Sequence, residues 1–352
     1  MKDINLDVQY YYGKELQKSS DLKTNACCTD EEYPRYIKDA LSQISDEVQI
    51  KYYGCGLVIP SAMKNITVLD LGSGSGRDVY VASQLVGENG LVIGVDMTKE
   101  QLDTAINSID LHRERFGYMT SNVKFIEGNI EELDSLGIEK ESIDLIISNC
   151  VINLVENKSK VLKDVYSLLK PGGEMYFSDV YSDRRIPMEL RRDKILWGEC
   201  LSGALYWNDF LRIAKGAGFI DPRVVKSNPI TVENEELQEL TGDIKFHSVT
   251  YRLFKIEGLE DSCEDFGQAV RYLGSIEHFP FGMELDNHHY FSTGKIESVC
   301  GNTYKMLHDT RYKNHFEFYG DFSTHYGIFT GCGENAPFSE NDSSSNLSAS
   351  CC

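Results

Sequence analysis

Two kinds of segment are missing from this sequence: a long hydrophobic run, and an apolar or arginine-rich leader. The first residues, Met1 to Asp7, are polar and acidic. A secretory signal needs an apolar stretch and a transit peptide needs a basic amphipathic face, so neither matches this start. We therefore expect a cytoplasmic protein that does not enter a membrane.

Basic residues are scarce relative to acidic ones. The 352 residues include 35 Lys and Arg against 55 Asp and Glu, a formal net charge of −20. Nucleic-acid binding depends on clustered cations, so this balance argues against a nucleic-acid partner. The hydrophobic content of 41% is typical of a globular protein, and the length allows two or three domains.

Cysteine is not scarce, but the spacing of a zinc finger is absent. No Cys-x-x-Cys pair and no His-x-x-x-His set occurs, which argues against a finger. Without a leader, the thiols are expected to be reduced rather than joined in a disulfide framework. Any site that they share must be assembled by the fold. The ten cysteines are residues 27, 28, 55, 150, 200, 263, 300, 332, 351 and 352.

The stretch from Ile66 to Asp78 is the most informative part of the chain. An apolar run, ITVLDL, is followed by glycines at 72, 74 and 76 and then by a helix-compatible segment. A strand that ends in such a turn can hold a nucleotide-like ligand, because glycine admits the ligand to the backbone and the helix offers unpaired N–H groups. The alternative is a tight turn that binds nothing.

Asp96 ends the next predicted strand, 20 residues after Gly76. An acidic side chain there can accept hydrogen bonds from ribose hydroxyls. Its alternative role is to cap the helix that begins near Thr98.

Alternating elements predict an α/β fold with a doubly wound, Rossmann-like sheet. We expect an N-terminal arm and cysteine loop at 1–60, a ligand-binding domain at 61–256, a small α+β domain at 257–330 and a disordered tail at 331–352. The expected strands are 66–71, 91–96, 123–127, 143–149, 174–180 and 246–256. The expected helices are 33–47, 77–87, 99–116, 158–169 and, with breaks, 187–217.

The glycine spacing differs from the Gly-x-Gly-x-x-Gly of dinucleotide enzymes. Together with Asp70, Gly128-Asn129-Ile130 and Pro171-Gly172-Gly173, it resembles class I S-adenosylmethionine methyltransferases. The resemblance implies that the glycine turn holds the methionine end, that Asp96 and Met97 contact the ribose and the adenine edge, and that Asn129 and Ile130 cover the adenine. The full predicted cofactor site is Asp70, Gly72, Ser73, Gly74, Gly76, Arg77, Asp96, Met97, Asn129, Ile130 and Asn149.

Three cysteines fall in loops that the predicted sheet brings to its ligand edge. Cys150 follows the fourth strand, Cys55 precedes the first, and Cys200 lies in the segment after the fifth. Each one could be a buried, inert thiol. Together they predict a site for a thiophilic ion, because thiolates select soft ions.

The contexts of four cysteines strongly resemble those of arsenite S-adenosylmethionine methyltransferases. The matching stretches are DLKTNAC at 21–27, YYGCGLV at 52–58, DLGSGSGRD at 70–78, SNCVINL at 148–154 and WGEC at 197–200, within a resemblance that covers about residues 7 to 330. It implies that Cys150 and Cys200 bind trivalent arsenic. It also implies that Cys27 and Cys55 either complete this site or resolve it by thiol–disulfide exchange. The doublet Cys27-Cys28 leaves that assignment open by one position, and Cys351 and Cys352 lie outside the match. The predicted arsenic ligands are Cys55, Cys150 and Cys200.

The implied chemistry requires no general base, because thiolates replace the hydroxyls of arsenite and its lone pair can attack the methyl group. Cysteine thiols would supply the reducing electrons, and thioredoxin or glutathione would then reduce the resulting disulfide. Tyr53 could stabilise the sulfonium by a cation–π contact or could simply pack under its loop. The expected function is the detoxification of arsenic. We expect the protein to be a monomer. The alternatives are a methyltransferase for a small organic or lipid acceptor, and a non-catalytic arsenite-binding protein.

Overall fold

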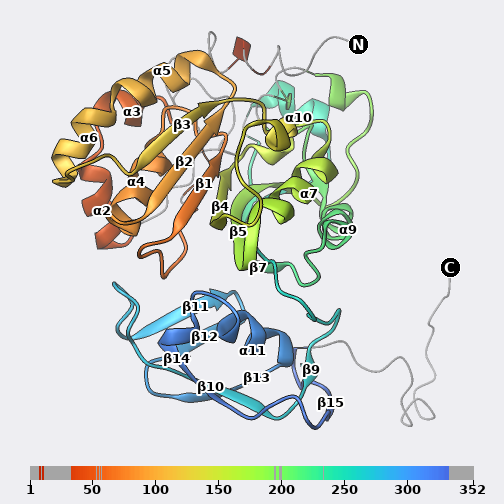
Figure 1. The fold of residues 1–352 in the computed structure, drawn as a ribbon. Helices are drawn as coiled ribbons and strands as arrows, with labels where there is room; N and C mark the ends of the chain where they lie inside the picture. The colour runs from red at the N-terminus through yellow and green to blue at the C-terminus, as the bar shows by residue number, and fades with distance from the viewer. Residues whose placement is uncertain are drawn as a thin grey trace.

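The structure is a computed structural model. It describes residues 8, 10–11, 33–52, 54, 56, 58–193, 196–197, 200–232 and 234–332. Figure 1 shows a large α/β unit with a smaller unit below it, formed by the chain after β8. Most of the predicted N-terminal arm and nearly all of the predicted tail lie outside the described residues.

One eight-stranded sheet forms the centre of the large unit, in the order β3-β2-β1-β4-β5-β8-β7, with β6 paired to β5. The strands from β3 to β5 are parallel, whereas β8 runs antiparallel to both β5 and β7. This arrangement confirms the predicted α/β class. The strands are β1 Thr67–Leu71, β2 Leu91–Asp96, β3 Val123–Glu127, β4 Ile143–Asn149, β5 Leu169–Ser182, β6 Leu205–Tyr206, β7 Arg223–Ile230 and β8 Phe246–Phe254.

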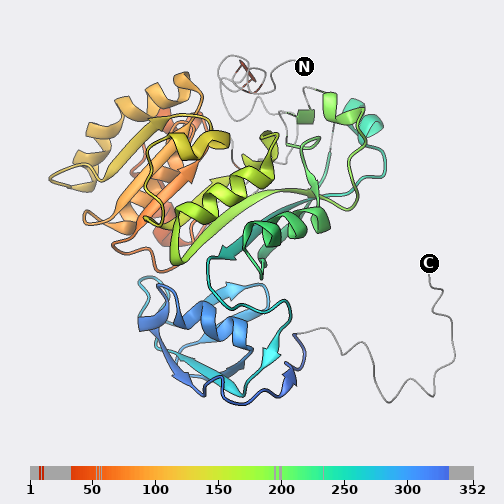
Figure 2. The ribbon, with the colours of Figure 1, turned by 45° about the vertical axis from the view of Figure 1, so that its right-hand side comes forward.

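Helices cover both faces of this sheet (Figure 2). Side chains alternate along a strand, so Leu145 and Ile147 enter the core beneath α4, whereas Ile146 enters the core beneath α7 and α9. Both faces are buried, which explains the nearly continuous apolar strand sequences. The helices are α2 Arg35–Ser42, α3 Asp46–Ile50, α4 Arg77–Val86, α5 Lys99–Asn107, α6 Ile109–Phe116, α7 Lys158–Leu168, α9 Trp207–Ala217 and α10 Glu235–Thr241, with short 3₁₀ turns η3 Ile130–Ser135, η4 Ile152–Leu154 and η5 Leu190–Arg192.

Two predicted helices are interrupted. The helix expected at 33–47 is divided into α2 and α3. The helix expected at 99–116 breaks at Ser108, whose hydroxyl donates to the Thr104 carbonyl at 2.8 Å. Serine hydroxyls compete in this way with the backbone ladder, and periodicity does not record the competition.

Two other predictions are corrected at the C-terminal half of the sheet. Strand β5 already begins at Leu169 and runs through the Pro171–Gly173 turn, because Gly172 and Gly173 exchange hydrogen bonds with Lys255 beyond β8. The described part of 187–217 contains the strand β6 as well as η5 and α9, so it is less helical than expected.

The smaller unit has its own core, built around Tyr272, Met283 and Leu307. It contains small antiparallel sheets and one α-helix, as an α+β domain should. Its elements are β9 Glu264–Asp265, β10 Gln268–Tyr272, β11 Gly282–Asp286, β12 His289–Ser292, β13 Ile296–Val299, α11 Gly301–His308, η6 Lys313–His315, β14 Phe316–Tyr319 and β15 Gly327–Ile328.

Buried ion pairs join the two units. Glu174 on β5 is fully buried and pairs with Arg252 on β8 and with Arg311 of the smaller unit. Arg252 also donates to the Tyr312 hydroxyl and to the Leu285 carbonyl, both at 2.8 Å. No described helix has the length and apolarity needed to span a bilayer.

Candidate functional site: a cofactor cavity with two adjoining cysteines

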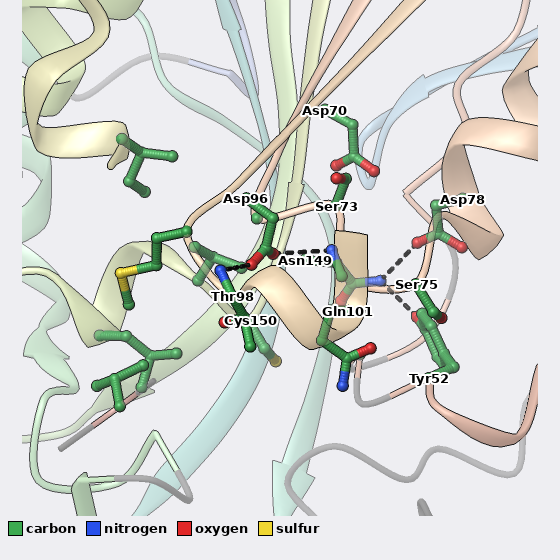
Figure 3. A pocket seen from close by; sticks show the side chains of 18 of the residues that line it. Tyr52, Asp70, Ser73, Ser75, Asp78, Asp96, Thr98, Gln101, Asn149 and Cys150 are labelled. Atoms are coloured by element: carbon green, nitrogen blue, oxygen red, sulfur yellow. Dashed lines mark hydrogen bonds between the residues drawn. The ribbon is translucent and has the colours of Figure 1, made fainter. Parts of the chain in front are cut away.

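A cavity opens at the carboxyl ends of β1, β2 and β4, and Figure 3 shows it from close by. Ligands of open α/β sheets bind at this edge. Most of the predicted cofactor residues line the cavity, and they come from four segments of the chain, at the ends of β1, β2, β3 and β4. These residues are Asp70, Gly72, Ser73, Gly74, Asp96, Met97, Asn129, Ile130 and Asn149, together with Cys150.

The glycine turn is shaped by its contact with β2. The N–H groups of Gly72 and Ser73 donate to the Val95 carbonyl at 2.8 and 3.0 Å. Gly72 and Gly74 have φ of +73° and +52°, which glycine adopts without strain. A Cβ on Gly74 would meet no protein atom within 4 Å. The turn therefore exposes bare backbone to open space, where a ligand can approach.

Asp96 both supports this turn and faces the cavity. One carboxylate oxygen accepts from the Gly74 N–H at 2.8 Å, and the other accepts from the Thr98 N–H at 2.7 Å. Burial raises the pKa of Asp96, although these backbone donors oppose the shift. The helix-cap alternative is wrong, because Thr98 rather than Asp96 is the N-cap of α5. A ribose contact of Asp96 stays compatible with both backbone contacts, because each oxygen has a second lone pair.

Gly76 and Arg77 are not among the residues that line the cavity. A Cβ on Gly76 would come within 2.9 Å of the Phe125 ring, so glycine is needed there for packing. The Arg77 guanidinium lies 3.1 Å from the centroid of the Tyr52 ring and pairs with Asp78. Both residues therefore pack against residues around the cavity and do not line it.

Tyr52 and Asp78 line the cavity although the sequence did not single them out as ligands. The Asn149 amide donates to the Tyr52 hydroxyl at 2.6 Å, to the Gly56 carbonyl at 2.8 Å and to Asp78 at 3.2 Å, and Figure 3 shows two of these contacts. Asp78 ended the motif on which the sequence comparison rested. That position was the available signal for it.

The cavity has an acidic lining that fits a cationic cofactor. Burial raises the pKa of Asp70 well above its usual range, and the charges of Asp78 and Asp96 raise it further. The Ser73 hydroxyl is buried with no hydrogen-bond partner among the described residues. S-adenosylmethionine carries a positive sulfonium and a positive ammonium group, so these residues fit it.

Cys150 and Cys200 meet beside the cavity. Both are buried, and the Cys200 thiol donates to the Cys150 carbonyl at 3.3 Å. Their φ values are +56° and +61°, a conformation that costs energy for residues other than glycine and that clusters at functional sites. Cys150 is disulfide-bonded. The predicted site residues Cys27, Cys28, Tyr53 and Cys55 lie outside the described residues.

A buried polar pair underlies the cysteine loop. Lys158 donates to the carbonyls of Asn153 and Val155, and Asp179 accepts from the N–H of Asn153 at 3.0 Å. Burial lowers the pKa of Lys158 to about 8 and raises that of Asp179 to about 7. Nothing in the spacing of the sequence pointed to this pair, because its members lie on different elements.

The sheet order, the glycine turn after β1 and the acidic end of β2 define a class I methyltransferase. A family model described as a methyltransferase domain matches residues 62–218. The chain is thus an S-adenosylmethionine-dependent enzyme, as the sequence predicted.

Near full-length relatives identify the family. The chain is 55% identical to an arsenite methyltransferase of Aquipseudomonas alcaligenes over 98% of this chain and 99% of that protein. It is 47% identical to the arsenite methyltransferase of Homo sapiens, covering 89% of this chain and 83% of that protein. A crystal structure of an arsenic(III) S-adenosylmethionine methyltransferase from Chlamydomonas reinhardtii matches with a TM-score of 0.82 and 48% identity, over 85% of this chain and 100% of that one. The chain belongs to the arsenite methyltransferase family.

Proposed function

We propose that this enzyme transfers methyl groups from S-adenosylmethionine to trivalent arsenic held by Cys150 and Cys200, giving mono- and dimethylated products for detoxification. The observation that carries the proposal is the contact of the Cys200 thiol with the Cys150 carbonyl, beside a cavity that Cys150 itself lines. The names of the full-length relatives support the choice of arsenite.

Residues of the large unit would hold the cofactor. The exposed backbone of Gly74 and the hydroxyl of Ser73 suit its methionine end, and Asp96 suits its ribose hydroxyls. The carboxyl groups of Asp70 and Asp78 line the same cavity, and a bound cation would favour their ionised forms and lower the raised pKa of Asp70. When bound, S-adenosylmethionine supplies an electrophilic methyl group, and the protein needs only to align a nucleophile with it and to exclude water.

The cysteine thiols prepare that nucleophile. Arsenite is uncharged near neutral pH, and each thiol that bonds to arsenic gives its proton to a departing hydroxyl, which leaves as water. Burial of Cys150 and Cys200 keeps the bound arsenic away from solvent. The arsenic lone pair is then the attacking group, so no side chain has to remove a proton from it.

Cysteine thiols also account for the electrons. Methylation formally oxidises arsenic from the trivalent to the pentavalent state, and two thiolates that join as a disulfide return the electron pair. Cys27 or Cys28 and Cys55 would supply and exchange these thiols, and thioredoxin or glutathione would reduce the disulfide. The disulfide at Cys150 suits the oxidised stage of such a cycle. Tyr53 would face the sulfonium.

Isotope transfer tests the activity. The reduced protein is incubated with methyl-labelled S-adenosylmethionine, arsenite and a thiol reductant, and products are separated by chromatography. Label in methylated arsenic is expected. Label only in an organic acceptor, or arsenite binding without transfer, would refute the proposal and favour one of the two alternatives.

Single substitutions test the site. Cys150→Ser and Cys200→Ser should each abolish arsenite methylation while retaining cofactor binding, whereas Cys351→Ser serves as a control outside the site. Full activity in either site variant would contradict the arrangement. Cys27→Ser and Cys55→Ser should still methylate monomethylarsenite, and loss of that step would give these cysteines a larger role.

A further inference from the structure

A second group of cysteines lies in the smaller unit. The sulfur atoms of Cys263, Cys300 and Cys332 all lie within 4.8 Å of one another. Within the described ranges, they are the one group of this kind that could hold a metal ion. They come from three distant segments, none of which lines the cofactor cavity. The chain after β8 thus assembles a trithiol cluster that methyl transfer at Cys150 and Cys200 does not use.

Strand pairing holds two of these cysteines together. β15 pairs antiparallel with β9, and Phe329, just beyond β15, donates to the Cys263 carbonyl at 2.7 Å. The Cys332 N–H in turn contacts the Phe329 carbonyl at 3.3 Å, and the sulfurs of Cys263 and Cys332 lie 2.7 Å apart. This edge of the smaller unit is visible beside β9 and β15 in Figure 1.

The third cysteine approaches from the helix. Cys300 is the N-cap of α11, and its sulfur accepts from the Thr303 N–H at 3.5 Å. It is fully buried, with the Thr303 hydroxyl at 3.3 Å and the Arg223 guanidinium at 3.9 Å. N–H donors and a neighbouring cation stabilise a thiolate, so this sulfur is placed to act as a ligand.

The charged groups around the cluster are already paired. Arg223 forms ion pairs with Asp221 and Asp286 at 2.7 and 3.0 Å. Asp286 also holds Nδ1 of His289 at 2.7 Å, and the other ring nitrogen is 3.4 Å from the Thr303 hydroxyl. Among the described residues, His289 is outside the mutually close set, although its ring also hydrogen-bonds the Cys332 side chain. Three sulfurs therefore converge, with the imidazole at the edge of the cluster.

We propose that Cys263, Cys300 and Cys332 form a second site for trivalent arsenic, distinct from the site of methylation. Three soft thiolates match an ion that takes three ligands and keeps a lone pair in the fourth position. Structural zinc requires a fourth ligand, which would have to be His289, whose Nε2 lies 3.4 Å from the Thr303 hydroxyl. Binding is an exchange without redox change: three S–H bonds and three As–OH bonds break, three As–S bonds form, and three waters leave. The choice of arsenic over another thiophilic ion rests on the proposed function.

Arsenic stoichiometry tests the site. The full-length Cys150→Ser/Cys200→Ser protein, reduced with a phosphine, is mixed with sodium arsenite and desalted, and arsenic and zinc per chain are measured by mass spectrometry. When Cys332→Ser is added to this double variant, the protein should bind one equivalent of arsenic less. Cys332 is chosen because it is the most accessible member of the cluster. Addition of Cys351→Ser is the matched control near the same end of the chain and should remove none of that equivalent. X-ray absorption should show three sulfurs around the arsenic lost with Cys332.

Other outcomes would overturn the proposal. An unchanged arsenic content in the Cys332→Ser variant would do so, and so would one zinc per chain in the purified protein that Cys332→Ser removes. Because Cys332 is accessible, the variant should still fold, and retained cofactor binding verifies this. Wild-type protein that keeps the Cys332-dependent arsenic but transfers no label would refute the proposed methylation and leave this site supported.

Discussion

Substitution of Asp96 by Asn tests the cofactor cavity at the point where loop geometry and ligand binding meet. The carboxylate accepts from the Gly74 N–H at 2.8 Å and from the Thr98 N–H at 2.7 Å. Asparagine offers only one oxygen, so its NH₂ group must face one of these donors. Loss of one hydrogen bond to a charged group costs about 1.5–3 kcal/mol.

Two measurements separate the two roles of Asp96. The melting temperature should fall by about 3–12 °C if the loss destabilises the domain, at about 2–4 °C per kcal/mol for a domain of this size. If the same carboxylate binds ribose, loss of a charged acceptor should also weaken S-adenosylmethionine binding about 10- to 150-fold by calorimetry.

A surface carboxylate provides the control. Asp103 is about half exposed, forms only an i,i+4 pair with Lys99, and should change neither value appreciably as Asp103→Asn. A lower melting temperature with wild-type affinity would refute the ribose contact. Wild-type values of both would refute the geometry of the turn.

Three further predictions concern backbone, packing and pH. Gly74→Ala should cost about 1–2 kcal/mol in the free energy of unfolding, because the φ of Gly74 is positive. The binding free energy of the cofactor should fall by more than this, because the new Cβ would enter the open cavity, and equal losses in calorimetry and in melting would contradict this. Glu174→Gln should destabilise the protein by about 3–5 kcal/mol in denaturant titration, since Arg252 and Arg311 lose their buried partner, and an unchanged midpoint would be a contrary result. Burial raises the pKa of Asp179 to about 7, so the folded state holds a proton that the unfolded state releases near pH 4. The stability of the wild type relative to Asp179→Asn should therefore fall from about pH 4 to about pH 7 and level off above it, and parallel stability curves would disprove this.

Local features of the sequence predicted much of the large unit. The run from Thr67 to Leu71 is a buried strand, and the glycines after it form a turn, because strand burial and positive φ leave a signature within a few residues. Asp96 could be placed at the end of β2 for the same reason. The break at Ser108 was missed, because the hydrophobic periodicity of the segment carries no signal for it.

The supporting contacts of the site were not predictable in the same way. Tyr52 reaches Asn149 across 97 positions of the chain, and Arg77 stacks on Tyr52 instead of facing the cavity. Sequence spacing records which residue types are available. It does not record which of them a side chain with several rotamers will contact.

The sequence by itself determined the α/β class, the cofactor turn and the supply of thiols, because these depend on periodicity, on glycine and on composition. Only the tertiary structure decided which thiols meet. The packing of the large unit brings Cys200 into contact with the Cys150 carbonyl. The pairing of β9 with β15 brings the sulfurs of Cys263 and Cys332 close together, although these residues are 69 positions apart in the chain. Sulfur chemistry acts over a few ångströms, and only the packed fold sets distances on that scale between segments so far apart in the chain.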